Sequence, residues 1–176
     1  SQHQQLAQLH DPTETGVLWQ RGETGVLYAS ATVQSFWLWS TQTLIHLGGQ
    51  LNQDVTDLVL TQELNLFEAQ ALLWSEPQQR YANVAQDGSL YSSSTTAAFL
   101  PLFGQLPTQE IAEQLLVGLL EVDPHTISPA EAFLIYQGLQ NYHIVGPAER
   151  WMRDWQELNL EKLSRYPYWV MLVSVY

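Results

Sequence analysis

The chain has 176 residues, of which 45% are hydrophobic and only 14% are charged, and its formal net charge is −12. This acidity argues against nucleic acid or an anionic membrane surface as a partner, because both carry negative charge. The lack of cysteine excludes disulfides and thiolate metal sites, and it leaves the compartment open. We find no apolar run of transmembrane length and no signal-peptide pattern, and the length predicts a single helical domain over residues 1–176.

The N-terminal part predicts a long loop over residues 10–25. Two similar hexapeptides, ETGVLW from Glu14 and ETGVLY from Glu23, lie nine residues apart. Two strands of a hairpin would explain them, as would two turns with similar chemistry. Long loops on helical scaffolds often carry function, so this loop is the first candidate for a site.

Two long helices and a hairpin are predicted next. The first helix starts at Ser30 or Thr32 and ends before Gly48-Gly49, and the second covers residues 54–73, capped by Asp54 or Thr56. The hairpin covers residues 80–91, with an Asp87-Gly88 turn. Helical spacing predicts a shared face in each helix: Val33, Phe36, Trp37, Ser40, Leu44 and Leu47 in the first, and Leu58, Thr61, Glu63, Phe67, Ala71 and Leu72 in the second.

The C-terminal half predicts stacked helices joined by short loops. Residues 95–103 form the first helix, Thr108 caps the second, and Ser128 caps the third with Pro129 and Glu131 in a capping box. The last helix opens at Pro147 and ends near Ser164, and the apolar residues 166–176 follow it. The buried faces are expected to be Ile111, Ala112, Leu115, Leu116, Leu119 and Leu120, then Phe133, Leu134, Ile135, Gly138, Leu139 and Tyr142, and last the stripe Ala148, Trp151, Trp155 and Leu158. Strands and helices do not alternate, so the fold class is all-α with antiparallel helical hairpins.

Several stretches, in this order, resemble the six-hairpin (α/α) toroid glycosidases. The trehalase-like and processing α-glucosidase-like enzymes are the first resemblance, and the α-L-rhamnosidases and debranching enzymes are the second. The resemblance implies a part of an (α/α)6 toroid, about half a ring, with one small β-hairpin. The stretches that carry it are residues 33–49, ALLWSE from Ala71, Arg80-Tyr81, Asp87-Gly88, TAAFLPLFG from Thr96, residues 107–120, residues 128–142 and AERW from Ala148.

The chain also departs from that family. The family uses a general acid in an early loop and a general base in a late loop. The segment that begins at Glu14 is similar to the acid loop, but Leu18 stands where the acid would be, and residues 166–176 contain no carboxylate. A full toroid also needs more residues than this chain has. The chain is therefore expected to be either a fragment of a larger glycosidase or a relict that has lost catalysis.

The candidate site residues lie in or near the long loop. Glycoside hydrolysis needs two facing carboxyl groups, and Glu14 and Glu23 are the candidates for an inverting reaction. The alternative is that they are solvated loop acids. Trp19, Arg21, Tyr28 and Trp37 are the candidate substrate-binding residues, because flat rings can stack on a sugar. For the tryptophans, the alternative is that they belong to the core.

No cofactor or metal is expected, because the five histidines show no metal-ligand spacing and no phosphate loop is present. The composition, rich in Trp and Gln and poor in charge, predicts carbohydrate as the partner. The sequence also allows a second function, a non-catalytic helical subunit. Such a subunit would dock, as a homo- or hetero-oligomer, through residues 166–176.

Overall fold

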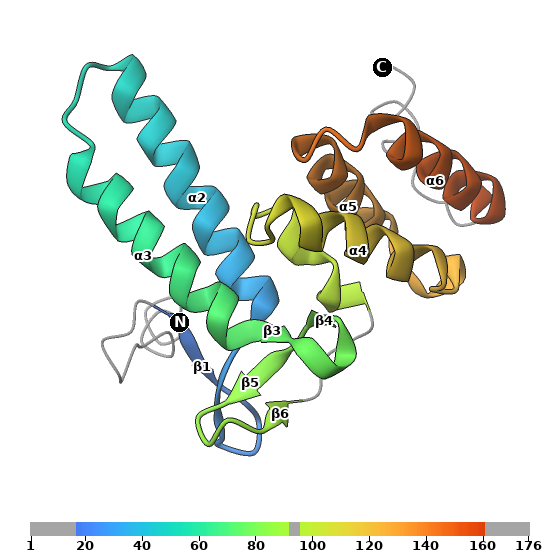
Figure 1. Cartoon of the computed structure of the whole chain (residues 1–176), viewed down its shortest axis with the longest axis horizontal. Helices are drawn as coiled ribbons and strands as arrows, with labels where there is room; N and C mark the ends of the chain where they lie inside the picture. The colour runs from blue at the N-terminus through green and yellow to red at the C-terminus, as the bar shows by residue number, and fades with distance from the viewer. Residues whose placement is uncertain (1–16, 92–95, 161–176) are drawn as a thin grey trace.

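The computed structural model describes residues 17–91 and 96–160, and its helices confirm the predicted all-α class (Figure 1). The N-terminal, internal and C-terminal segments outside these ranges include Glu14 and the apolar residues 166–176. The α-helices are α2 (Ala31–Gln50), α3 (Thr56–Leu73), α4 (Gln109–Leu120), α5 (Pro129–Asn141) and α6 (Val145–Leu158). The short elements are the strands β1 (Trp19–Arg21), β2 (Leu27–Ala29), β3 (Trp74–Ser75), β4 (Arg80–Tyr81), β5 (Asn83–Ala85) and β6 (Leu90–Tyr91) and the 3-10 turns η1 (Glu76–Gln78), η2 (Thr96–Ala98), η3 (Leu100–Leu102) and η4 (Pro124–Thr126).

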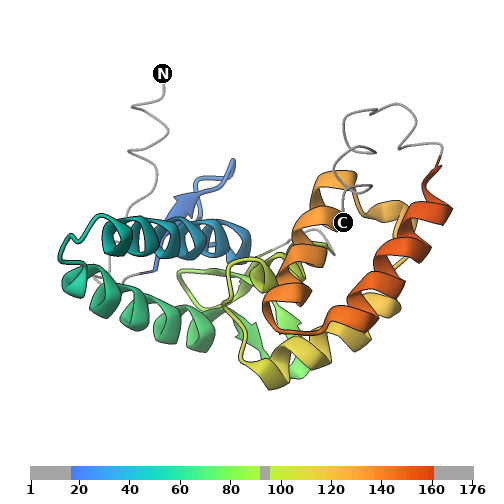
Figure 2. The ribbon, with the colours of Figure 1, turned by 90° about the horizontal axis from the view of Figure 1, so that it is seen from above.

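The helices follow an arc. Helices α2 and α3 lie side by side at one end, and α5 and α6 lie at the other (Figure 2). The turn η3 packs against α2 on one side and against α5 on the other, so it connects the two groups of helices. Helical hairpins that succeed one another around an arc are the arrangement that the sequence predicts.

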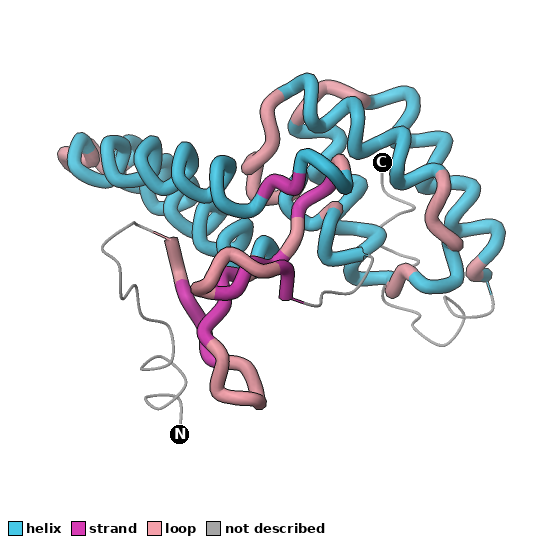
Figure 3. Tube along the Cα trace, turned by 60° about the horizontal axis from the view of Figure 1, so that its bottom comes forward, coloured by secondary structure: helices cyan, strands magenta, loops and turns pink. Residues whose placement is uncertain are grey.

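A small antiparallel sheet lies beside the helices, and Figure 3 shows its strands in magenta. Its order is β1-β2-β5-β6, and β3 pairs separately with β4. Within the predicted hairpin of residues 80–91, β5 and β6 pair around a turn with Gly88 at φ +84°, whereas Arg80–Tyr81 form β4 and pair with β3. The strands β1 and β2 pair as a hairpin, but of the first hexapeptide only Trp19 lies in β1, and residues 14–16 lie outside the described residues. Pairing of β2 with β5 joins the two hairpins into one sheet.

The predicted helix over residues 95–103 is wrong in its described part. Residues 96–102 form η2 and η3, two separate 3-10 turns. Pro101 has no N–H to donate to a helical ladder, and this shortens any helix at that point. The segment is nevertheless deeply buried, with Leu102 and the following Leu106 fully inaccessible to solvent. Burial thus comes from its place between α2 and α5 and does not need a regular helix.

Two glycines allow this central segment to approach both neighbours. A Cβ atom at Gly138 of α5 would lie 2.6 Å from the backbone carbon of Leu102, and one at Gly104 would meet the backbone of Ser35 in α2. Both contacts are with backbone atoms, which cannot rotate away. The side-chain amide of Gln70 in α3 adds a hydrogen bond to the carbonyl of Leu106.

The caps of α4 and α5 are confirmed. Thr108 Oγ1 accepts the N–H of Ile111 at 3.3 Å, and Ser128 and Glu131 form the predicted capping box. Glu131 has a second role, because its Oε1 accepts the hydroxyl of Thr96 at 2.6 Å and so fastens α5 to η2. Partial burial raises the pKa of this carboxyl, but the hydrogen bonds from Thr96 and Ser128 outweigh that effect and hold the pKa below its usual value.

The buried faces of α2 and α3 are not the predicted ones. The expected face of α2 is largely turned to solvent, with Leu44 57% and Leu47 47% exposed, and Phe67 in α3 is 71% exposed. Apolar spacing fails as a guide here, because the buried sides are made largely of small and polar residues. The side chains that are buried are Ala31, Gln34, Ser35, Leu38 and Thr41 in α2, and Asn65, Ala69 and Leu73 in α3.

Smaller corrections concern helix ends. Helix α3 begins after Val55 with no side-chain cap, although Asp54 Oδ1 accepts the N–H of Thr56 at 3.0 Å. Helix α6 begins at Val145, before Pro147, and ends at Leu158. Leu120 and Leu158, each placed on a buried face by the sequence, are 64% and 54% exposed because they lie at the last position of their helices.

The close approach of Gly138 to the backbone of Leu102 predicts that a larger residue at position 138 destabilises the fold. Replacing Gly138 with Ala should lower the free energy of unfolding by about 1–3 kcal/mol, because the new methyl group overlaps backbone that cannot move aside. Gly118→Ala in α4 is the matched control, since its Cβ would find only Phe99 at 3.8 Å and should stabilise the helix by up to ~1 kcal/mol. Urea unfolding of both variants checks the difference, and an equal effect of the two substitutions would contradict it.

The capping box predicts a pH dependence. Folding lowers the pKa of Glu131, so its carboxylate favours the folded state above the ordinary glutamate pKa of about 4.3. That contribution disappears as the pH falls through the lower, folded-state pKa. Glu131→Gln should therefore be less stable than the parent at pH 7, and the gap should narrow towards pH ~3. Urea midpoints across this range measure it, with Glu149→Gln on the exposed surface of α6 as the control; parallel curves for parent and Glu131→Gln would argue against the assignment.

Candidate functional site

The β1–β2 hairpin carries most of the residues that the sequence singles out. Trp19 pairs with Ala29 and Gln20 pairs with Tyr28 across the hairpin. Side chains alternate along a strand, so Trp19 and Tyr28 lie on opposite faces of the sheet. Trp19 is 5% exposed on the inner face, and Tyr28 is half-buried on the outer face. The two rings therefore cannot contact the same sugar from one side.

Tyr28 stacks on Tyr91 of β6. The ring centroids are 4.1 Å apart and the ring planes differ by 11°. Burial, and to a lesser extent the neighbouring phenol of Tyr91, raises the pKa of Tyr28. A Cβ at Gly22 would lie 2.5 Å from the Tyr91 hydroxyl, so the glycine makes room for this pair. Tyr91 therefore covers one face of the Tyr28 ring.

Two charged residues of the loop, Arg21 and Glu23, lie at or next to the tip of the hairpin. Glu23 is exposed, and Arg21 is held by a hydrogen bond from its Nη1 to the carbonyl of Gly25 at 2.8 Å. Arg21 also lines a shallow hollow with Gln86 and Asp87. Glu14 lies outside the described residues, so the structure places only Glu23 of the proposed carboxyl pair.

Aromatic side chains form a cluster on α2 that the sequence did not predict. Trp39 and Phe36 pack against Phe103, with ring centroids 5.3 Å and 5.9 Å from it. Trp37 and Trp39 are each 44% exposed, whereas Leu38 between them is buried. The aromatic run FWLW at residues 36–39 was the available sequence signal for Trp39. The sequence could not single out Phe103 as an aromatic neighbour of Trp39, because residues 95–103 were expected to form a buried helix.

Two buried N–H donors without a partner lie where β1 meets α2. Gln34 is fully buried, and its Oε1 accepts the N–H of Leu18 at 3.1 Å, while its Nε2 makes no hydrogen bond. Trp19 Nε1 is likewise buried and unpaired. An unpaired buried donor is costly, and a water or a ligand oxygen would satisfy either one.

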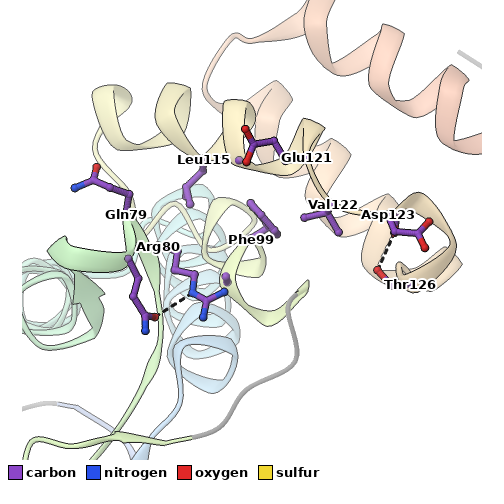
Figure 4. Close-up of a pocket in the computed structure, with 11 residues that line it drawn as sticks. Gln79, Arg80, Phe99, Leu115, Glu121, Val122, Asp123 and Thr126 are labelled. Atoms are coloured by element: carbon purple, nitrogen blue, oxygen red, sulfur yellow. Dashed lines mark hydrogen bonds between the residues drawn. The ribbon is translucent and has the colours of Figure 1, made fainter.

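A second hollow, of about 450 Å³, lies between β4, η2 and the end of α4 (Figure 4). Arg80 lines it on one side, where its Nε donates to Gln78 Oε1 at 3.0 Å. Glu121 and Asp123 line it on another side. Asp123 also caps η4, because its Oδ1 accepts the N–H of His125 at 3.0 Å. Both charge signs in a hollow of this size suit a small polar ligand. The sequence offered no signal for it, because its residues come from distant segments.

Residues 17–91 and 96–160 contain neither a metal-ligand cluster nor a membrane-spanning helix. There, no group of three or more His, Asp or Glu residues could hold a metal ion. No helix among the same residues is long and apolar enough to cross a bilayer.

Comparison with known proteins finds similar folds among solved structures. The mannosylglycerate hydrolase of glycoside hydrolase family GH63 from Thermus thermophilus, in complex with Tris, matches 79% of this chain with a TM-score of 0.67 and 18% identity. Its complex with glucose matches 77% with a TM-score of 0.66 and 18% identity, and an uncharacterized conserved protein from the same organism matches 77% with a TM-score of 0.65 and 17% identity. No family model matches the sequence, and no curated protein is similar to it.

These matches concern the fold. They show that the described helices are arranged like part of these solved structures. The chain spans 39–41% of the length of these three structures.

Proposed function

We propose that this chain is a carbohydrate-active domain of glycoside hydrolase type, which binds or hydrolyses an oligosaccharide or disaccharide. The likeness of its fold to a GH63 hydrolase, over 77–79% of the chain, is the observation that supports the proposal. Structures of that hydrolase hold glucose, or Tris and D-glycerate. The many exposed aromatic rings and the low charge of this chain suit a neutral polar ligand.

In this proposal the chemistry belongs to two carboxyl groups. Glu23 and Glu14 would act as the acid and the base of an inverting reaction, in which one protonates the leaving oxygen and the other activates water. Glu23 is exposed at the hairpin tip, where a bound sugar can reach it. Arg21, two residues earlier, can donate hydrogen bonds to sugar hydroxyls from the nitrogens that do not bind Gly25.

The rings would hold the sugar. Trp37 presents an exposed surface on α2, and Tyr28 has one ring face not covered by Tyr91. Trp19 is buried, so its part would be to donate its unpaired Nε1–H to a ligand oxygen. Stacking of ring faces on a sugar gives affinity, and hydrogen bonds give the choice of sugar.

If Glu23 and Glu14 are the catalytic acid and base, removing either carboxyl group should slow hydrolysis. Glu23→Gln and Glu14→Gln should each lower kcat/KM by about 10²–10⁴-fold, the usual contribution of a general acid or base. NMR detection of the released sugar gives the rate and shows which anomer forms first. Glu63→Gln, exposed on α3, is the control and should keep the parent rate. Parent-like rates in the Glu23 and Glu14 variants would remove both residues from the mechanism.

If the exposed indole of Trp37 stacks on a sugar, its removal should weaken saccharide binding. Trp37→Ala should weaken saccharide binding about 10-fold, whereas Leu47→Ala, similarly exposed on the same helix, should not change it. Titration calorimetry with trehalose, maltose, rhamnosides, glucosyl-oligosaccharides and mannosylglycerate measures the affinity. If no saccharide binds the parent at millimolar concentration, the carbohydrate proposal fails.

A second candidate function is a non-catalytic helical subunit. The exposed Leu and Phe side chains of α2 and α3 favour it, because large apolar side chains that gather on a surface often mark an interface. Its proposed docking segment, residues 166–176, lies outside the described residues. Oligomerisation that disappears when residues 166–176 are deleted, together with no saccharide response, would support this function over the first.

A further inference from the structure

Helix α2 turns its apolar side to solvent. Its buried side is mixed, with Gln34, Ser35 and Thr41 beside Ala31 and Leu38. Its exposed side carries Leu44 and Leu47, and Leu51 follows at the C-cap; these are 57%, 47% and 70% exposed. The apolar stripe of a helix normally faces the core, so an exposed stripe of this kind invites a covering partner.

The exposed side of α2 has the spacing of a coiled-coil seam. Six residues along this side, beginning with Val33 and ending with Leu51, follow one another at intervals of four, three, four, three and four residues. This is the a/d pattern of heptads, which lets one helix pack along another. The polar member, Ser40, donates its hydroxyl to the carbonyl of Phe36 at 2.8 Å, so it needs no water when the seam is covered. We call this set the α2 seam: Val33, Trp37, Ser40, Leu44, Leu47 and Leu51.

The absence of charged side chains distinguishes the α2 seam from the other exposed apolar residues. Among the α-helices of the described part, α2 alone contains no Asp, Glu, Lys or Arg. Helix α3 also has exposed apolar side chains at heptad spacing, namely Leu60, Leu64 and Phe67, but Asp57 and Glu63 are exposed on the same helix. Two copies of a chain with a net charge of −12 repel each other. They meet with the least repulsion along a helix that has no charged side chain.

We infer that the α2 seam is the contact surface for a second copy of this chain. An uncharged, apolar seam is complementary to itself, and a symmetric pair of α2 helices closes at two copies. The helix is about 30 Å long, so the contact lies at the small end of stable interfaces and we expect micromolar dissociation. The inference goes beyond the proposed function, and a monomeric chain would leave that proposal standing.

The test compares two matched double substitutions in the full chain. Leu44→Glu with Leu47→Glu puts two charges into the α2 seam, and Val117→Glu with Leu120→Glu puts two charges, at the same spacing, on equally exposed residues of α4. Sedimentation velocity from ~5 to ~200 µM should show dimers for the parent and for the α4 variant. The seam variant should remain monomeric over this range, with an unchanged circular dichroism spectrum.

A second measurement uses the absence of cysteine from the chain. Ser40→Cys, Leu44→Cys and Leu47→Cys each introduce a single thiol in the seam, and Val117→Cys introduces one outside it. Under mild oxidation, at least one seam variant should give a disulfide-linked dimer several times faster than Val117→Cys.

Three results would overturn the inference. The first is a parent chain that stays monomeric at ~200 µM, which would mean that the seam has another occupant or none. The second is equal dimerisation of the two double variants, and the third is cross-linking at equal rates inside and outside the seam.

Discussion

The close contact between backbones at the middle of the chain is the constraint on which the arc of helices depends. Gly104 lets the central segment approach Ser35 of α2, and Gly138 lets α5 approach Leu102 from the other side. A side chain at either glycine would push the two groups of helices apart. Two side-chain hydrogen bonds also hold the C-terminal helices to the loops before them. The hydroxyl of Tyr142 donates to the carbonyl of Pro107 at 2.7 Å, and the indole N–H of Trp155 donates to the carbonyl of Pro124 at 3.0 Å.

The same constraint determines what is left exposed. Because η3 covers only one side of α2, the opposite side keeps its Leu and Trp side chains at the surface. The sheet is placed beside the start of α2 by the hydrogen bond from the N–H of Ala31 to Asn83 Oδ1 at 3.0 Å. The β1–β2 hairpin and the exposed rings of α2 thus belong to neighbouring parts of the molecule. This is the region in which the proposed carbohydrate site and the α2 seam are both located, and Trp37 belongs to both.

The comparison with solved structures bears on the fold, and the carbohydrate-active function is a proposal built on that fold. The similar structures share the arrangement of hairpins at 17–18% identity, and this chain spans about two fifths of their length. In the described residues, the candidate side chains are spread over two faces of a sheet and one helix. The buried, unpaired donors of Trp19 and Gln34 and the aromatic cluster around Phe103 lie apart from the charged residues at the hairpin tip, so the described residues do not bring these groups into one site.

The sequence by itself determined the features that depend on near neighbours in the chain. The caps at Thr108 and Ser128, the Asp87-Gly88 turn and the helical class were predicted correctly, because each depends on residues within one or two turns. Only the tertiary structure decided which side of α2 is buried, because the side with the apolar spacing is the exposed one and the buried side is largely polar. It also decided that residues 96–102 form 3-10 turns, that Trp19 and Tyr28 face apart, and that Phe103 meets Trp39. Each of these depends on contacts between segments far apart in the sequence, and local spacing carries no information about which segments will meet.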